Sequence, residues 1–245
     1  MGRCPADMVD IAGRFCIDRY ESTLVDNSSG HVFSPYYSPS PQAARQAYQK
    51  WSGRGRPPGL FALDVPVLPD WQLEPDLVPL AVSKPGVIPQ GYMSGAQAAA
   101  ACAAANKRLC TAEEWELACR GQRGSKFPYG DHYESGACNV CRPAHPALIL
   151  HGDASVGHRD PRLNMVEHQG ERLLRPTGFT PRCKSVWGND GVYDMVGNLD
   201  EWLDDPDGLF AGGFFSRGTK AGCQARVSVH PPQYFDYSLG VRCCR

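Results

Sequence analysis

A twelve-residue stretch, Gly191–Trp202, constrains the fold of this chain more than any other part of it. Its sequence, GVYDMVGNLDEW, places a Gly-Asn pair among apolar anchors and oxygen-bearing side chains. Because a Gly-Asn pair favours positive φ, we expect the chain to turn back sharply at Gly197. Ca²⁺ prefers about six to eight oxygen ligands, so Asp194 and Glu201 on the two sides of the turn are candidate ligands. The alternative is that these acids only cap and solvate a turn between two strands.

Length and composition favour a loop-rich globular protein. The 245 residues suit one domain of moderate size or two small ones. A net charge of −1 predicts no strong attraction to nucleic acid or to anionic membranes. The 26 glycines and 21 prolines, with little long helical periodicity, favour an α+β fold over a helix bundle. The sequence has no apolar run of about 18 residues, so no transmembrane segment is expected.

The chain has eleven cysteines, a high number for a cytosolic protein. Disulfides persist in oxidising compartments, so we expect a secreted, periplasmic or cell-surface protein. The sequence shows no signal peptide, and residues 1–3 before Cys4 are interpreted as an added start. Export is therefore inferred from the cysteines, and the removal of a leader or a lipid anchor is left open. An odd number of cysteines means that at least one thiol is unpaired or pairs with another chain.

The first 80 residues predict a hairpin followed by an irregular surface segment. Apolar residues between Met8 and Glu21, with a break at Gly13, indicate two short strands around a turn. Cys4 and Cys16 flank this hairpin, so they are able to pair. Residues 24–80 are rich in proline and read as an ordered surface insertion, with a short helix over residues 42–51. Long ordered loops of this kind often carry a binding surface.

Two helices are predicted in the middle of the chain. Ser94 with Gln97 forms a capping box that opens an alanine-rich helix reaching about Asn106. Thr111 with Glu114 forms a second capping box, and that helix ends at Gly121. From residue 127 to the end, the pattern predicts turns and short strands.

Four blocks of the sequence, in order, resemble one known family. Gly191–Trp202 resembles the signature of the formylglycine-generating enzyme family, the sulfatase-modifying-factor domain. RLCTAEEWELACRG (108–121) with FPYGD (127–131), GG…C.AR…LGVRC (212–243) and FCIDRYEST (15–23) resemble its other blocks. The chain is therefore identified as a member. The resemblance implies a C-type-lectin-like α+β fold of short antiparallel strands, two main helices and ordered loops, as a single domain over residues 1–245.

The resemblance also implies how the cysteines pair. Family members with extra cysteines link the first helix to the last strand and the second helix to the C.AR strand. Carried over by position, this implies the pairs Cys102–Cys243 and Cys119–Cys223. Cys110 would then lie beside Cys102, which makes Cys244 its natural partner. Cys183 can pair with Cys138 or with Cys141, and both choices stay open. Cys138-Asn-Val-Cys141 also has the spacing of a redox pair or of half a zinc site, but no second CxxC or HxxxH accompanies it.

The residues that carry the family's chemistry are missing. Members that make formylglycine bind copper with two cysteines after the C-terminal Gly-Gly and oxidise a substrate cysteine. Here the first position holds Arg217, and the second falls at Gly222 or in a gap. Cys223 matches the C.AR block and reads as a disulfide partner. Because a thiolate pair binds copper(I) and arginine does not, formylglycine generation is disfavoured.

Calcium is the cofactor that the resemblance implies, at two structural sites. The first would use Asp194, the carbonyls of Gly197 and Leu199, and Glu201. The second would use Asn139, the carbonyl of Val140, Asp153 and the carbonyl of Ser155. Calcium bound there would tie loops together by mass action and would perform no chemistry.

The leading functional hypothesis is an exported, calcium- and disulfide-stabilised module that binds an unidentified protein, peptide or glycan. Its candidate surface consists of Arg217, His230, Tyr234, Phe235 and Tyr237, since exposed aromatics and arginine often anchor recognition. Ordinary strand packing is the alternative role of these residues. The enzyme alternative is an oxidase or tailoring enzyme with a rebuilt copper or iron site. Its candidate ligands are the loop histidines His132, His145, His151, His158 and His168.

Overall fold

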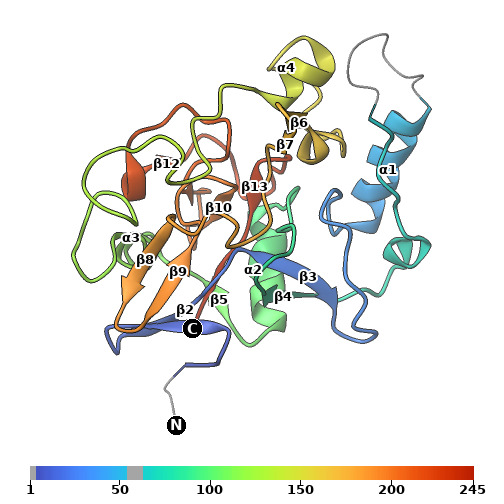
Figure 1. The fold of residues 1–245 in the computed structure, drawn as a ribbon. Coiled ribbons are helices and arrows are strands. Elements are labelled where there is room, and N and C mark those ends of the chain that lie inside the picture. The colour runs from blue at the N-terminus through green and yellow to red at the C-terminus, as the bar shows by residue number, and fades with distance from the viewer. Residues whose placement is uncertain (1–3, 54–62) are drawn as a thin grey trace.

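Within residues 4–53 and 63–245, which the computed structural model describes, the strands form two four-stranded sheets and three two-stranded ribbons (Figure 1). One sheet has the order β1 (Met8–Ile11), β2 (Phe15–Asp18), β14 (Cys243–Cys244), β5 (Arg108–Leu109). The other has the order β12 (Arg226–Val227), β11 (Phe210–Ala211), β10 (Asp200–Trp202), β13 (Leu239–Gly240). The ribbons pair β3 (Ser22–Asp26) with β4 (Pro79–Ser83), β6 (Glu167–His168) with β7 (Glu171–Arg172), and β8 (Lys184–Trp187) with β9 (Asp190–Tyr193). The predicted fold of short, mostly antiparallel strands is confirmed.

The N-terminal hairpin forms as predicted. β1 and β2 are antiparallel, and the turn between them places Ala12 and Gly13 at positive φ. The last strand, β14, then joins β2 with Cys244 opposite Ile17. The two ends of the described chain therefore meet in one sheet.

Both predicted capping boxes are present. Ser94 caps α2 (Gly95–Ala104), and Thr111 caps α3 (Ala112–Arg120). In each, the backbone N–H of the capping residue donates in return to the side chain of the third residue of its helix. The predicted helix in the insertion is also present, as α1 (Pro41–Ser52). Ser40 caps it, and Pro41 at the first helical position has no N–H to leave unsatisfied.

One helix was not predicted. α4 (Pro146–His151) lies in the part of the chain for which only turns and short strands were expected. Its six residues make fewer than two helical turns, so they show no usable periodicity. Three 3₁₀ turns were also missed: η1 (Asp70–Leu73), η2 (Leu163–Met165) and η3 (Gly222–Gln224). α1 and α4 thus accompany the two main helices that were expected.

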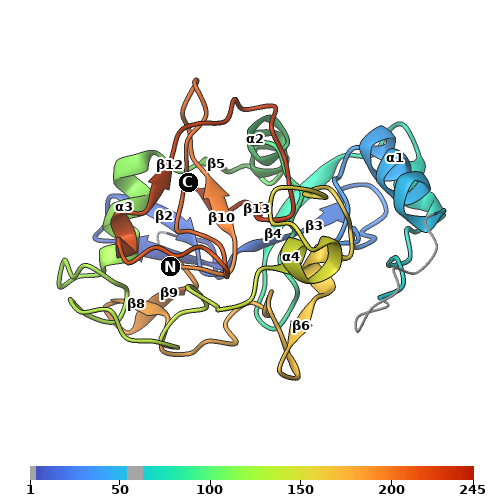
Figure 2. The same ribbon diagram turned by 90° about the horizontal axis from the view of Figure 1, so that it is seen from above.

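The insertion is more regular at its base than predicted. β3 and β4 pair from Ser22↔Ser83 to Asp26↔Pro79, so the two ends of residues 24–80 form a ribbon. Between them, Tyr37, Ala44 and Leu68 form a small core of their own. Figures 1 and 2 place α1 at one edge of the molecule, opposite α3 and the β8–β9 ribbon. Residues 54–62 of the predicted insertion lie outside the described residues.

Five disulfides cross-link the described chain. They are Cys4–Cys16, Cys102–Cys243, Cys110–Cys244, Cys119–Cys223 and Cys138–Cys183. Four of these are the expected pairs, and the fifth resolves the open choice for Cys183. Cys141 is a free, half-buried thiol.

Separate apolar clusters lie under the two sheets and under the C-terminal loops. One is centred on Trp115, a second on Trp202, and a third includes Leu199, Phe215 and Tyr237. None of the helices in the described ranges is long and apolar enough to cross a membrane. The single domain over residues 1–245 stays a prediction.

Candidate functional site

The Gly191–Trp202 stretch contains β9, the predicted turn and β10. Gly197 and Asn198 have φ values of 85° and 62°. A Cβ on Gly197 would lie 2.2 Å from the carbonyl oxygen of Asn139, so a side chain does not fit there. The Asn198 side chain donates to Glu21 Oε2 at 2.6 Å. The turn therefore joins the start of the chain to the loop that contains Asn139.

The acids of this stretch lie in a buried cluster with Arg242. Arg242 Nη2 donates to Glu201 Oε1 at 2.7 Å, and both side chains are almost fully buried. Trp115 Nε1 donates to Glu201 Oε2 at 2.6 Å. Asp194 and Glu21 are close enough to this pair to interact with it electrostatically. Arg242 is thus the cation that compensates this acidic cluster.

Burial favours the protonated forms of two acids in the cluster. Burial, with the nearby charges of Asp194 and Glu201, raises the pKa of Glu21 well above its ordinary range. Burial also raises the pKa of Asp194 to about 7. A single guanidinium therefore does not have to balance three full negative charges.

The first predicted calcium set does not fit a cation in this arrangement. Both carboxylate oxygens of Glu201 already accept hydrogen bonds from Arg242 and Trp115. Asp194 accepts a hydrogen bond from the Gly178 N–H at 2.6 Å. Across residues 4–53 and 63–245, no group of three or more His, Cys, Asp or Glu side chains is arranged to hold a metal ion.

In the second predicted calcium site, one atom, Asn139 Oδ1, is suited to bind the ion. The Asn139 amide nitrogen donates to the Leu173 carbonyl at 2.8 Å and to Asn198 Oδ1 at 3.0 Å. Its Oδ1 is buried and has no hydrogen-bond partner among the described residues. Asp153 and Ser155 are exposed and bond to each other in a local turn. Calcium binding therefore stays a prediction, and Asn139 is the residue that suits it best.

Arg217 stands where the family resemblance places the first catalytic cysteine. Its Nη2 donates to Asp200 Oδ2 at 2.6 Å, and the Gly213 N–H donates to Asp200 Oδ1 at 2.8 Å. Burial raises the pKa of Asp200 to about 6, although Arg217 opposes the shift. Cys223 is bound to Cys119. The loop thus presents an anchored arginine, and the cysteine nearest to it in sequence has no thiol to offer.

A hollow of about 380 Å³ lies beside this arginine. It gathers four of the five predicted surface residues: Arg217, His230, Tyr234 and Tyr237. The remaining lining residues are His145, Ala154, His158, Phe210, Phe214, Val227, Val229, Asp236 and Ser238. We call this the Arg217 hollow. Several separate loops build its walls, so residues distant in the sequence meet there.

The polar groups of the Arg217 hollow are held in fixed positions. Tyr237 Oη and His145 Nε2 are 3.1 Å apart, and Tyr234 Oη donates to Asp236 Oδ2 at 2.7 Å. The His230 ring stacks on Tyr234 with 3.8 Å between centroids. Burial raises the pKa of both tyrosines, and burial lowers the pKa of His145. The hollow therefore offers aromatic rings, two tyrosine hydroxyls and the Asp236 carboxyl next to the Arg217 guanidinium.

Phe235, the fifth residue of the predicted surface, does not line this hollow. Its ring lies under the guanidinium of Arg159, with 4.1 Å from Cζ to the ring centroid. It lines a different hollow, on the side of α1.

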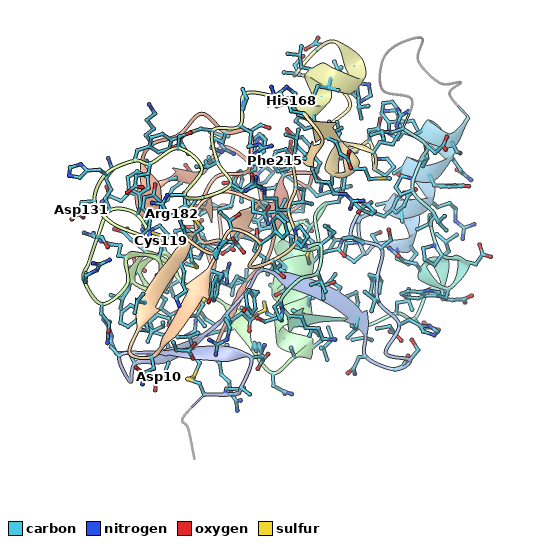
Figure 3. All side chains as sticks on the ribbon, viewed as in Figure 1. Asp10, Cys119, Asp131, His168, Arg182 and Phe215 are labelled. Carbon is cyan, nitrogen blue, oxygen red and sulfur yellow. A yellow bond between two sulfur atoms is a disulfide. The ribbon has the colours of Figure 1, made fainter. Side chains whose placement is uncertain are left out.

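The predicted histidines do not converge on one centre. His145 and His158 reach the Arg217 hollow. His132 is exposed next to Asp131, and His168 lies on β6 (Figure 3). His151 Nε2 lies 3.2 Å from Asp160 Oδ2.

Seven other lining residues were not singled out from the sequence: Ala154, Phe210, Phe214, Val227, Val229, Asp236 and Ser238. Of these, Phe214 directly follows the Gly212–Gly213 pair, and Asp236 lies between the predicted residues Phe235 and Tyr237. Both lie within three residues of predicted surface residues, so closeness in sequence to those residues was the signal that could have identified them.

Comparison with known proteins shows the family of this chain. The sulfatase-modifying factor enzyme 1-like domain family matches residues 80–245, so the chain belongs to that family. The inactive Cα-formylglycine-generating enzyme 2 of Mus musculus is 31% identical over 117 residues, which are 47% of this chain and 31% of the mouse protein. The protein of the same name from Bos taurus is 32% identical over 115 residues, 46% of this chain and 32% of its own length. The chain thus matches about a third of the length of these relatives.

Among solved structures, PvdO from Pseudomonas aeruginosa is similar with a TM-score of 0.44 and 15% identity, over 94% of this chain and 80% of PvdO. The Major Tropism Determinant I1 variant is similar with a TM-score of 0.47 and 12% identity, over 99% of this chain and 53% of that protein.

Proposed function

We propose that this chain is an exported, non-catalytic binding module whose protein, peptide or glycan ligand occupies the Arg217 hollow. The observation that carries the proposal is the anchoring of Arg217 to the buried carboxylate of Asp200. That arginine takes the place where formylglycine chemistry needs a thiol. The relatives described above are named as inactive enzymes, which agrees with this proposal.

One atom in the hollow supports the presence of a ligand. Arg217 Nε is buried and lacks a hydrogen-bond partner within the described residues. Buried polar groups are normally hydrogen-bonded, so this N–H is available to an acceptor on a bound molecule. The stacked rings of His230 and Tyr234 offer a flat apolar wall next to it. A ligand with a planar or ring-shaped group and a hydrogen-bond acceptor suits this combination.

An oxidase with a rebuilt copper or iron site remains the alternative function. His145 and His158 are the histidines of the predicted set that line the hollow, with Tyr237 between them. No third His, Cys, Asp or Glu completes a metal-binding group with them in the described ranges. The binding module is the better supported proposal.

The binding proposal is tested with peptide and glycan arrays probed by the purified, oxidised chain. We expect array binding that Arg217→Met weakens at least tenfold, because the guanidinium contributes charged hydrogen bonds. Arg182→Met is the matched control, since Arg182 is exposed and does not line the hollow. Binding that is equal in both variants would contradict the assignment of the Arg217 hollow.

Calcium stabilisation is a separate part of the proposal. If Asn139 Oδ1 binds calcium, EGTA lowers the melting temperature of the chain, because the ion binds the folded state alone. Asn139→Ala should remove the sensitivity to EGTA, whereas Asp153→Ala should keep it because Asp153 lies in an exposed local turn. A melting temperature that EGTA leaves unchanged would count against calcium.

A further inference from the structure

A second hollow, of about 190 Å³, lies between α1 and the loops that precede β13. Its lining residues are Tyr36, Tyr37, Ser38, Ala43, Gln46, Ala47, Lys50, Trp51, Tyr92, Arg159 and Phe235. None of these lines the Arg217 hollow. We call it the aromatic hollow, and a role for it goes beyond the proposed function.

The walls of the aromatic hollow are formed in advance by buried rings. Tyr37 and Tyr92 are each almost fully buried. Tyr37 Oη donates to the Pro66 carbonyl at 2.6 Å, and Tyr92 Oη donates to the Asp160 carbonyl at 2.5 Å. Because both hydroxyls are committed to backbone carbonyls, the two tyrosines form a fixed floor beneath the hollow, and the half-buried rings of Tyr36 and Phe235 present apolar surface to it. A ligand ring therefore meets a surface that needs no rearrangement.

The charges at the aromatic hollow have one sign. Lys50 and Arg159 are exposed, and both line it. No aspartate or glutamate is among the described residues that line it. Lys50 Nζ lies 5.1 Å from the Trp51 ring centroid, and Arg159 Cζ lies 4.1 Å from that of Phe235. These faces already hold cations, so the hollow favours an anionic ligand over a quaternary ammonium.

We propose that the aromatic hollow is a second binding site, for a small molecule that carries one aromatic ring and a carboxylate. The ring would lie above the floor formed by Tyr37 and Tyr92, against the half-buried rings of Tyr36 and Phe235. The carboxylate would accept hydrogen bonds from Arg159 and Lys50. The volume is below the usual range of about 300–1,000 Å³ for drug-sized ligands, which limits the occupant to about one ring.

The walls of the aromatic hollow come from two parts of the chain. The residues from Tyr36 to Trp51 lie in the insertion, outside the family match at residues 80–245. Tyr92, Arg159 and Phe235 lie inside that match. The insertion thus completes a hollow for which the family domain supplies one side.

The test is a ligand-observed NMR titration of the oxidised full chain with three probes. Phenylacetate has the ring and the carboxylate, 2-phenylethanol has the ring alone, and tetramethylammonium is the cationic control. We expect phenylacetate to bind at least tenfold more tightly than 2-phenylethanol, and tetramethylammonium not to compete with it. Equal binding of the two ring probes, or no binding of phenylacetate, would overturn the proposal.

Two variants with changes in the aromatic hollow locate the binding, and a third variant, in the Arg217 hollow, is the control. The double substitution Lys50→Gln with Arg159→Gln should weaken phenylacetate at least tenfold, and both side chains are exposed, so the fold should persist. Ala47→Leu should weaken both ring probes by occupying the hollow. Arg217→Met should leave phenylacetate binding unchanged, which separates this site from the Arg217 hollow. Phenylacetate binding that Arg217→Met weakens and the other variants do not would overturn the assignment.

Discussion

The insertion at residues 24–80 and the rest of the chain are held together by different means. All ten paired cysteines lie outside the insertion. The rest of the chain also contains the buried Arg242–Glu201 ion pair. The insertion has no disulfide and is held by the small core around Tyr37, by the β3–β4 ribbon, and by Leu24 and Phe33, which pack into the cluster of Trp202. The Arg217 hollow therefore lies in a cross-linked frame, whereas the aromatic hollow depends on how α1 packs.

The largest expected effect in the cross-linked part comes from Arg242. Arg242→Met leaves Glu201 buried without its cation, and breaking a buried pair in this way costs about 3–5 kcal/mol. Urea unfolding measures the loss. Arg226→Met is the matched control, because its partner Glu116 and Arg226 are both partly exposed, and a loss of about 1 kcal/mol or less is expected. Equal losses in the two variants would contradict the role given to Arg242.

Removal of one long-range disulfide should have the next largest effect. Cys119→Ala with Cys223→Ala opens a link between residues 104 apart in sequence and should lower the unfolding free energy by about 2–5 kcal/mol. The unfolded chain gains freedom, and the α3–η3 contact loses its covalent link. Denaturant unfolding of both forms checks the value. A variant as stable as the parent would show that packing alone holds this contact.

The pH dependence of stability should reveal Asp18, which accepts a hydrogen bond from Lys107 Nζ at 2.6 Å. Burial outweighs this contact and raises the pKa of Asp18 from 3.8 to about 6. The folded state therefore holds the proton more tightly than the unfolded chain. The contribution of Asp18 is fully present below about pH 4 and is lost as the pH rises through about 6, by up to about 3 kcal/mol.

Asp18→Asn should flatten this part of the pH profile, since the amide does not titrate. Urea unfolding at several pH values between 4 and 7 compares the variant with the parent. A parent whose stability rises over that range, with the same slope in Asp18→Asn, would contradict the assignment.

The smallest expected effect lies in the insertion. Tyr37→Phe leaves the buried Pro66 carbonyl without its donor and should cost about 1 kcal/mol. Amide hydrogen exchange should detect the loss in α1 and not in α2, because the insertion opens separately from the cross-linked part. An equal change in both helices would mean that the two regions unfold together.

Most of the fold features that could be predicted came from sequence patterns that span only a few residues. The capping boxes at Ser94 and Thr111 fix where two helices begin, because each depends on residues three positions apart. α4 gave no such signal, since six residues show no periodicity. The pairing of β3 with β4 was missed because more than 50 residues separate the two strands, and no local pattern reports such a contact.

Prediction of the candidate site was limited in the same way, to patterns that are local in the sequence. Arg217, His230, Tyr234 and Tyr237 could be named because they follow recognised blocks of the sequence. The partner of Glu201 could not be named, because Arg242 lies 41 residues away and meets it only in the folded chain. Asp194 and Glu201 therefore looked like calcium ligands, although Arg242 supplies the positive charge beside them.

The Arg217 hollow is proposed to bind a ligand and not to generate formylglycine. The most direct test incubates the oxidised chain with copper(I), oxygen and a cysteine-containing sulfatase peptide, and analyses the peptide by mass spectrometry. An active member of the family serves as the positive control. We expect the peptide cysteine to remain unmodified with this chain, because Arg217 stands in place of a catalytic thiol and Cys223 is bound to Cys119. Formylglycine in the peptide would contradict the proposal that this chain is a non-catalytic binding module.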